Sequence, residues 1–162
     1  MSMKKSVFTI LLCCLIIFGC NGKNNSIISP DPIIDDLIKS PTSIQIDSTN
    51  FVLSVYLWRD FMPISPPDGK PMLASVEILT SDSSDFPENI DADKMWVIDS
   101  TNSWETFLYD QSVHESYSIL KKASNGPKWE IGIFLDVVVR LVQDDTLYHY
   151  LKIEDVLLRR TD

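Results

Sequence analysis

From Ser43 onward, apolar residues recur at every second position, and this period constrains the fold more than any other feature of the chain. The longest run, 131–142, places six apolar side chains on one face: Ile131, Ile133, Leu135, Val137, Val139 and Leu141. Asp136 and Arg140 fall on the other face. Alternation of this kind is typical of β-strands that bury one face. A one-residue slip would carry both charges into the core, so the pattern predicts a firmly set register.

Further segments of strand length follow the same logic. They are separated by turn-forming residues and comprise 43–47, 51–59, 72–79, 94–99, 104–110 and 146–153. About seven short strands with turns between them predict an all-β domain over 43–162, an immunoglobulin-like β-sandwich. The cysteine pair of antibody domains is missing, so the topology rests on the strand pattern alone.

The N-terminus is organised differently. Lys4 and Lys5 precede an apolar run of 12 residues, 7–18, that only Thr9 interrupts. A membrane-spanning helix needs roughly 20 residues, so this run is better suited to a cleavable secretory signal. An ordinary signal cleavage site usually has two small residues, whereas here only Gly19 is small.

Ile17-Phe18-Gly19-Cys20 resembles the signal of bacterial lipoproteins, in which an aliphatic, a variable and a small residue precede a lipidated cysteine. The resemblance implies cleavage between Gly19 and Cys20, a diacylglyceryl group on the sulfur and often a further acyl chain such as palmitate on the new amine. One acyl chain holds a protein to a membrane only marginally, and two or three acyl chains hold it stably. Residues 1–19 would then be the signal peptide, and Cys20 the membrane anchor.

Cleavage before Cys20 would also determine which cysteines remain and what net charge the mature chain carries. Cys13 and Cys14 would be removed with the signal, leaving neither a disulfide nor a free thiol. Loss of Lys4 and Lys5 would change the net charge from −9 to −11. A surface this acidic repels phosphate backbones, so no nucleic-acid partner is expected.

Residues 20–42 are interpreted as the lipidated cysteine and a tether, because Asn, Ser and Pro dominate the segment. Within it, PIIDDLIK at 32–39 has helical spacing and predicts a short helix that rests on the domain. The residue after the cysteine is Asn21. It does not resemble the inner-membrane retention signal of enterobacterial lipoproteins, which has aspartate at this position. The expected location is therefore the outer membrane. The acidic residues that mark surface export in some Bacteroidetes lipoproteins are missing close behind the cysteine, so the periplasmic face is expected.

Motifs for catalysis or metal binding are weak. His114 and His149 are the only histidines, and the sequence contains no HExxH, GxSxG or glycine-rich phosphate loop. The loop 80–94 gathers five acidic residues that could offer oxygen ligands to Ca²⁺, but it lacks the glycine-centred pattern of a calcium-binding hand. No catalytic residue, metal or cofactor is predicted.

Four tryptophans, Trp58, Trp96, Trp104 and Trp129, are the remaining candidates for ligand binding. Exposed indoles can form a platform for sugar rings, whereas buried ones fill a core. Trp58 and Trp129 each adjoin a turn and are the better candidates for exposure. Trp58 also precedes RDFMPISPPDGKP at 59–71, a loop too long for a tight hairpin and a natural recognition edge.

The tetrapeptide DSTN occurs twice, at 47–50 and at 99–102. Asp and Asn favour turns, which is sufficient to explain both copies. Asp-Ser-Thr also resembles short O-glycosylation sites of exported Bacteroidetes proteins.

Three functional hypotheses follow. The leading one is a membrane-anchored envelope lipoprotein whose non-catalytic sandwich binds or organises another envelope component. The first alternative is a carbohydrate-binding lipoprotein that uses exposed tryptophans. The second is a hydrolase whose site the sequence does not locate.

Overall fold

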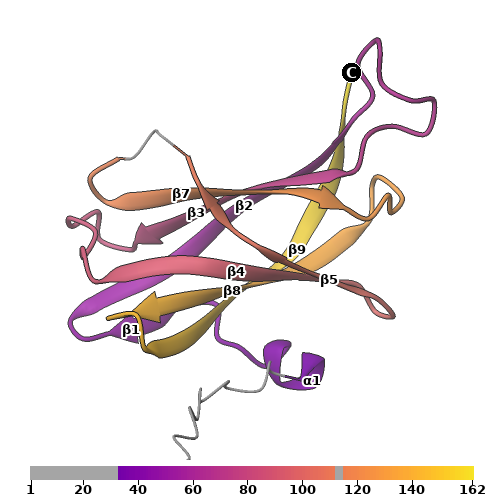
Figure 1. Ribbon diagram of the computed structural model, residues 1–162. Coiled ribbons are helices and arrows are strands. Elements are labelled where there is room, and N and C mark those ends of the chain that lie inside the picture. The colour runs from indigo at the N-terminus through magenta and orange to yellow at the C-terminus, as the bar shows by residue number, and fades with distance from the viewer. Residues whose placement is uncertain (1–32, 112–114) are drawn as a thin grey trace, which may run out of the picture. The chain divides into compact units, whose positions relative to one another are not determined.

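The structure is a computed structural model that describes residues 33–111 and 115–162. The regular secondary structure of the described chain is almost entirely β-strand, which confirms the predicted all-β class (Figure 1). Its elements are α1 (Ile34–Leu37), β1 (Ile44–Ile46), β2 (Thr49–Asp60), β3 (Met72–Thr80), β4 (Ile90–Ile98), β5 (Ser103–Phe107), β6 (Tyr109–Asp110), β7 (Ser118–Gly126), β8 (Phe134–Gln143) and β9 (Leu147–Thr161).

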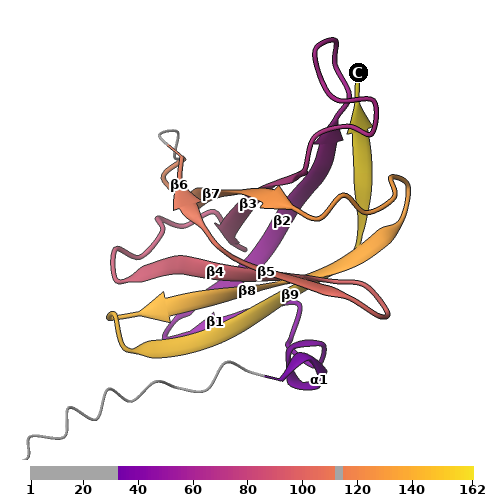
Figure 2. The same ribbon diagram turned by 45° about the vertical axis from the view of Figure 1, so that its right-hand side comes forward.

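The strands hydrogen-bond in the order β5-β4-β8-β9-β2-β3-β7-β6, with β1 added to β2. This order can be divided into two layers of four strands, β5-β4-β8-β9 and β2-β3-β7-β6, and the immunoglobulin-like topology stays a prediction. The two layers are not separate, however. β9 pairs antiparallel with β8 and then, from Leu158, parallel with β2. On the opposite side β5 leads directly into β6 of the other layer (Figure 2), so the sheet is nearly closed into a barrel.

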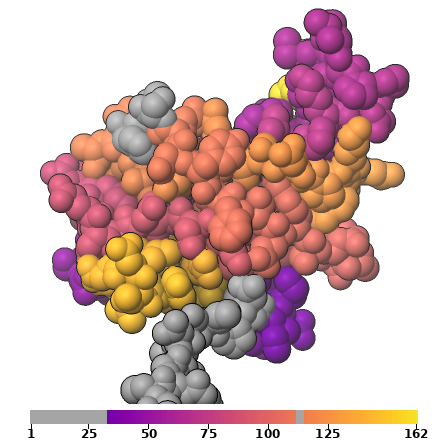
Figure 3. Space-filling view, viewed as in Figure 1, coloured from indigo at the N-terminus to yellow at the C-terminus, as the bar shows by residue number. Residues whose placement is uncertain are grey.

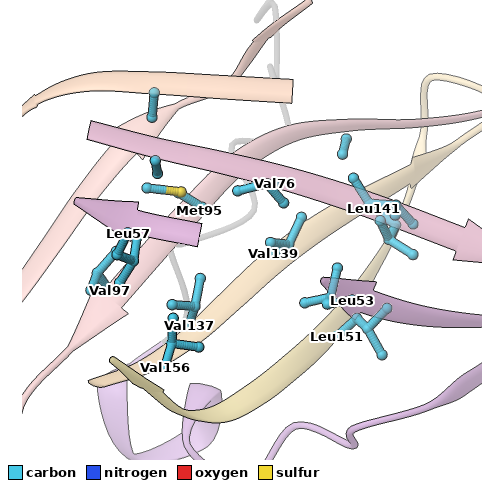
Figure 4. Packing of buried hydrophobic residues seen from close by; sticks show 14 of the residues in the cluster. Leu53, Leu57, Val76, Met95, Val97, Val137, Val139, Leu141, Leu151 and Val156 are labelled. Carbon is cyan, nitrogen blue, oxygen red and sulfur yellow. The ribbon is translucent and has the colours of Figure 1, made fainter. Parts of the chain in front are cut away.

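The predicted apolar row of β8 lies in the core between the layers. Leu135, Val137, Val139 and Leu141 are each at most 1% exposed and pack against residues of β2, β3, β4 and β9 (Figure 4). The first two members of the row were assigned wrongly to the strand. Ile131 is exposed in a turn, and Ile133 is only partly buried, because Gly132 at φ +85° ends the alternation before β8 begins.

One strand, β7, was not predicted. Its sequence, SILKKASNG, has two adjacent lysines and no apolar alternation. Lys121 is nevertheless 4% exposed, because Asp91 and Asp110 both pair with its ammonium group. Burial acts to lower the pKa of Lys121, but hydrogen bonds to the two carboxylates outweigh burial, and the pKa is raised.

Helix α1 packs on the outer face of the β5-β4-β8-β9 layer. Leu37 is fully buried there in a second apolar cluster with Trp96, Ile98 and Val138. Lys152 of β9 fixes the segment further, since its backbone N–H and its Nζ donate to the carbonyls of Pro41 and Ile38, at 2.8 and 2.6 Å. Residues 33–42 of the predicted tether therefore pack with the domain.

Candidate functional site

The tryptophans do not form an exposed platform. Trp96 is buried, and Trp58, Trp104 and Trp129 are half-buried. Trp129 packs against the main core, while the ring of Trp58 lies 5.4 Å from that of Tyr56 on the outer face of β2. Both candidates for ligand binding thus contribute to packing. Trp129 also lines a surface hollow of about 330 Å³ with Lys128 and Ile133, so a role of Trp58 or Trp129 in ligand binding stays a prediction.

His149 links two turns of the domain. Its Nε2 lies 3.1 Å from Oε1 of Gln143, whose amide nitrogen donates to Asp47 at 3.0 Å. Since that amide oxygen can only accept, Nε2 of His149 carries the proton. This chain of hydrogen bonds ties the β8–β9 hairpin to the β1–β2 turn. His114 lies outside the described residues.

The acidic residues of the 80–94 loop have separate roles. Asp82 accepts hydrogen bonds from the backbone and hydroxyl of Ser84, which closes the turn. Asp93 holds Arg140 through two hydrogen bonds, at 2.8 and 2.6 Å, and thereby raises the pKa of Arg140. Within 33–111 and 115–162 no three His, Cys, Asp or Glu side chains are placed to hold a metal ion.

The most distinctive surface is the loop between β2 and β3, residues 61–71, which we call the arm. It projects beyond the sheet at one end of the domain (Figures 1 and 3). Two proline turns build it. Ser65 N–H donates to Met62 O at 2.9 Å around Pro63 and Ile64, and Gly69 N–H donates to Pro66 O at 2.8 Å.

Arg59 fixes the base of the arm. Arg59 is 5% exposed, and its guanidinium donates to four backbone carbonyls, those of Lys70 (3.0 Å), Trp129 (2.9 Å), Lys128 (3.3 Å) and Asp68. It also lies 5.1 Å from the ring centre of Phe61. Two further residues enclose Phe61: a Cβ added at Gly69 would lie 2.5 Å from its ring, and the guanidinium of Arg160 lies 4.1 Å from the ring centre.

Two ion pairs brace the arm at its surface. Lys70 binds Asp60 at 2.7 Å and Lys128 binds Asp68 at 2.6 Å. These hydrogen bonds lower the pKa of both carboxyl groups below the ordinary aspartate value. Because the pKa values are lower folded than unfolded, the pairs stabilise the arm fully above the ordinary value and cease to do so as pH falls through the lowered values. They are therefore intact at neutral pH.

The tip of the arm combines strain with exposure. Met62 is half-exposed and Ile64 is fully exposed. Ile64 has φ +86° in the turn that follows Pro63, a position where type II turns require glycine or asparagine. A β-branched residue at positive φ is a true outlier, and such backbone strain costs about 1–3 kcal/mol.

Beside the base of the arm, a groove follows the stretch where β9 leaves β8 for β2. We call it the crossover groove. One hollow of about 350 Å³ and another of about 410 Å³ share Tyr56, Leu157 and Arg159. A β-bulge opens the groove: Glu154 and Asp155 of β9 lie opposite the single residue Asp136, and Asp155 adopts φ +55°.

Comparison with known proteins gave no match: no family model, curated protein or solved structure matches the chain. Among the helices of the described residues, none has both the length and the apolarity to cross a membrane.

Proposed function

We propose that the chain is a lipid-anchored lipoprotein of the cell envelope and that its β-domain is a non-catalytic module that binds a protein through the arm. The anchor would be Cys20, in the outer membrane and facing the periplasm. The proposal combines the signal-like N-terminal sequence with a rigid, projecting, apolar loop on a small all-β domain.

The packing of α1 supports a short connection between anchor and domain. Only residues 21–32 would remain between Cys20 and the first described residue of the domain, Ile33. A segment of 12 residues can span about 40 Å at most. Within the domain, α1 and the arm lie at opposite ends in both ribbon views (Figures 1 and 2). A domain held in this way presents the arm away from the point where its tether begins.

The single observation that carries the binding proposal is Ile64. Folding does not account for a fully exposed isoleucine in a glycine position, because the residue contributes strain and buries no apolar surface. Apolar anchors on rigid loops are the residues that dominate protein–protein contacts once a partner covers them. A protein partner explains Ile64 better than a glycan does, since the tip offers methyl groups and no hydrogen-bonding side chain.

Ile64→Gly and Ile64→Asp are expected to separate binding from stability. Glycine relieves the turn strain and adds unfolded-state entropy, so Ile64→Gly should be as stable as the parent or more stable by up to about 1 kcal/mol. Both variants should lose partner binding by tenfold or more in pull-down from cross-linked envelopes. If both variants bind the partner as tightly as the parent does, the tip of the arm is not the contact.

Cys20→Ser tests the anchor. Without the sulfur, the chain should remain uncleaved or appear in the soluble fraction, whereas the parent should fractionate with outer membranes and carry acyl mass on Cys20. Mass spectrometry of the mature N-terminus together with membrane fractionation provides the measurement. A parent N-terminus other than Cys20, without acyl mass, would refute lipidation.

A further inference from the structure

The loop between β7 and β8, residues 127–133, carries an indole that folding leaves partly open. Trp129 packs against the main core and also lines the surface hollow of about 330 Å³, together with Glu130 and Ile133. Its indole N–H is not buried, and no described residue accepts a hydrogen bond from it. One side chain thus offers the hollow both an apolar surface and an available donor.

Arg59 fixes the backbone that carries this indole. Arg59 is buried, and its guanidinium donates to the carbonyls of Trp129 and Lys128, at 2.9 and 3.3 Å. The side chain of Lys128 is held as well, by its ion pair with Asp68. The position of Trp129 is therefore set before a ligand arrives, so little conformational entropy is lost when the ligand binds.

A second hollow adjoins the first at the turn between β4 and β5, residues 99–102. It also has about 330 Å³, and it lies between α1 and the polar side chains of the turn, Ser100, Thr101 and Asn102. Asp99 lines both hollows. In both ribbon views the turn lies between α1 and the loop that carries Trp129 (Figures 1 and 2). Because the two hollows share Asp99, they form one groove, which we call the turn groove.

The charges of the turn groove exclude several classes of ligand. Asp35, Asp99 and Glu130 line it without an ion pair to any described residue, whereas its lysine, Lys128, is already paired. Free carboxylates repel an anion. A purely apolar ligand would remove water from the polar lining without replacing its hydrogen bonds. Among the described residues these carboxylates are not placed together to hold a metal ion.

A neutral sugar satisfies the same lining. Its hydroxyl groups can donate to the carboxylates of Asp99 and Glu130 and accept from the indole N–H of Trp129, while the C–H groups of its ring contact the indole. Each hollow lies at the lower end of the range of roughly 300–1,000 Å³ that holds ligands in proteins. Two such hollows side by side suit adjacent units of an oligosaccharide.

We propose that the turn groove binds a neutral oligosaccharide, with Trp129 against the ring of one unit and Asp99 accepting hydrogen bonds at the junction with the next. The inference goes beyond the proposed function, because the turn groove lies outside the arm and takes a different class of ligand. Arg59 supports both surfaces, since the same guanidinium fixes the base of the arm and the backbone of Trp129. The domain can therefore hold a glycan and a protein at the same time.

The indole N–H signals of the four tryptophans test the site by nuclear magnetic resonance. The chain is expressed at full length with isotope-labelled tryptophan and purified in a phosphocholine detergent, which carries no sugar headgroup. Replacing each tryptophan in turn with phenylalanine assigns the signals. Cellobiose, chitobiose, maltose and mannobiose are each titrated to about 10 mM, which is about tenfold above a weak Kd of about 1 mM. Spermidine is titrated as a cationic comparison.

At least one disaccharide should shift the Trp129 signal in a saturable manner and leave the Trp58 signal in place. Added salt should not change the Kd, because a neutral ligand carries no charge to screen. Glu130→Ala should raise the Kd about tenfold, since it removes an acceptor from the groove. Glu88→Ala, at an exposed carboxylate outside the groove, is the matched control and should bind as the parent does.

The inference is overturned if no disaccharide shifts the Trp129 signal, or if all four indole signals shift equally. A Trp129 shift with spermidine alone also overturns it, because the groove would then be a site for cations. The proposed role of the arm is tested independently. Ile64→Asp, which should lose the protein partner, should keep the parent's Kd for the disaccharide, and a raised Kd would contradict the turn groove as the sugar site.

Discussion

Val137→Asp is expected to leave the domain largely unfolded. Val137 is 0% exposed at the centre of β8 and packs in the main core with residues of both layers (Figure 4). The aspartate would bury a carboxylate without a partner, at several kcal/mol against a typical domain stability of 5–15 kcal/mol. The register of β8 pairs Val137 with Val97 of β4 and with Ile153 of β9. The aspartate therefore cannot move to the outer face unless this register breaks.

Urea unfolding of fragment 33–162, followed by far-UV circular dichroism, measures this effect. Asp136→Asn is the matched control on the neighbouring residue: Asp136 is only half-buried, and its carboxylate accepts one long hydrogen bond from Asp155 N–H. The control should remain folded with a change below about 1 kcal/mol. The parent fragment has no cysteine and should unfold identically with and without reductant. Equal midpoints for Val137→Asp and the parent would mean that the wrong face of β8 had been assigned to the core.

Arg59→Met is expected to have the second-largest effect, concentrated in the arm. Methionine replaces the aliphatic stem but leaves four carbonyls at the arm base without their donor. Each unsatisfied buried group costs about 1–3 kcal/mol, and partial access of water reduces the sum, so a loss of about 2–4 kcal/mol is expected. The arm should become mobile while the two layers persist.

Hydrogen exchange resolved by residue measures this change. The amides of Gly69 and Lys70, which donate to Pro66 O and Asp60 O, should lose protection, whereas those of β8 should change only in proportion to global stability. Arg159→Met is the control, because Arg159 is exposed on the same end of the domain and contacts the ring of Tyr56. Retained protection of Gly69 in Arg59→Met would contradict the bracing role of Arg59.

A strand could be predicted from the sequence when it buries one face of apolar side chains, and was missed when it does not. Strands with one apolar face, such as β2, β3 and β8, follow the period of two, and their registers agree with it. β7 escaped detection because its central buried residue is Lys121, which ion pairs from distant segments stabilise. The C-terminal half of β9, residues 154–161, was missed for a different reason: the bulge at Asp155 shifts the alternation by one residue.

The candidate site was only partly predictable. The length and prolines of 59–71 indicated a rigid recognition loop, and the structure has a braced, projecting arm at this place. The sequence also held an unused signal: Arg59 continues the inward row of Phe51, Leu53 and Leu57, so an arginine at that position indicated a buried guanidinium with several acceptors. By contrast, the crossover groove depends on contacts between β2, β8 and β9, which no local pattern specifies.

The most direct test of the arm as the recognition surface is photo-crosslinking in living cells at position 64. A photoreactive amino acid replaces Ile64 in one strain and Phe107 in another, since both side chains are exposed, one in the β2–β3 loop and the other at the end of β5. After irradiation, the position-64 strain should yield one or a few discrete cross-linked protein products that the position-107 strain lacks. No discrete product at position 64, or the same set of products from both positions, would contradict the account.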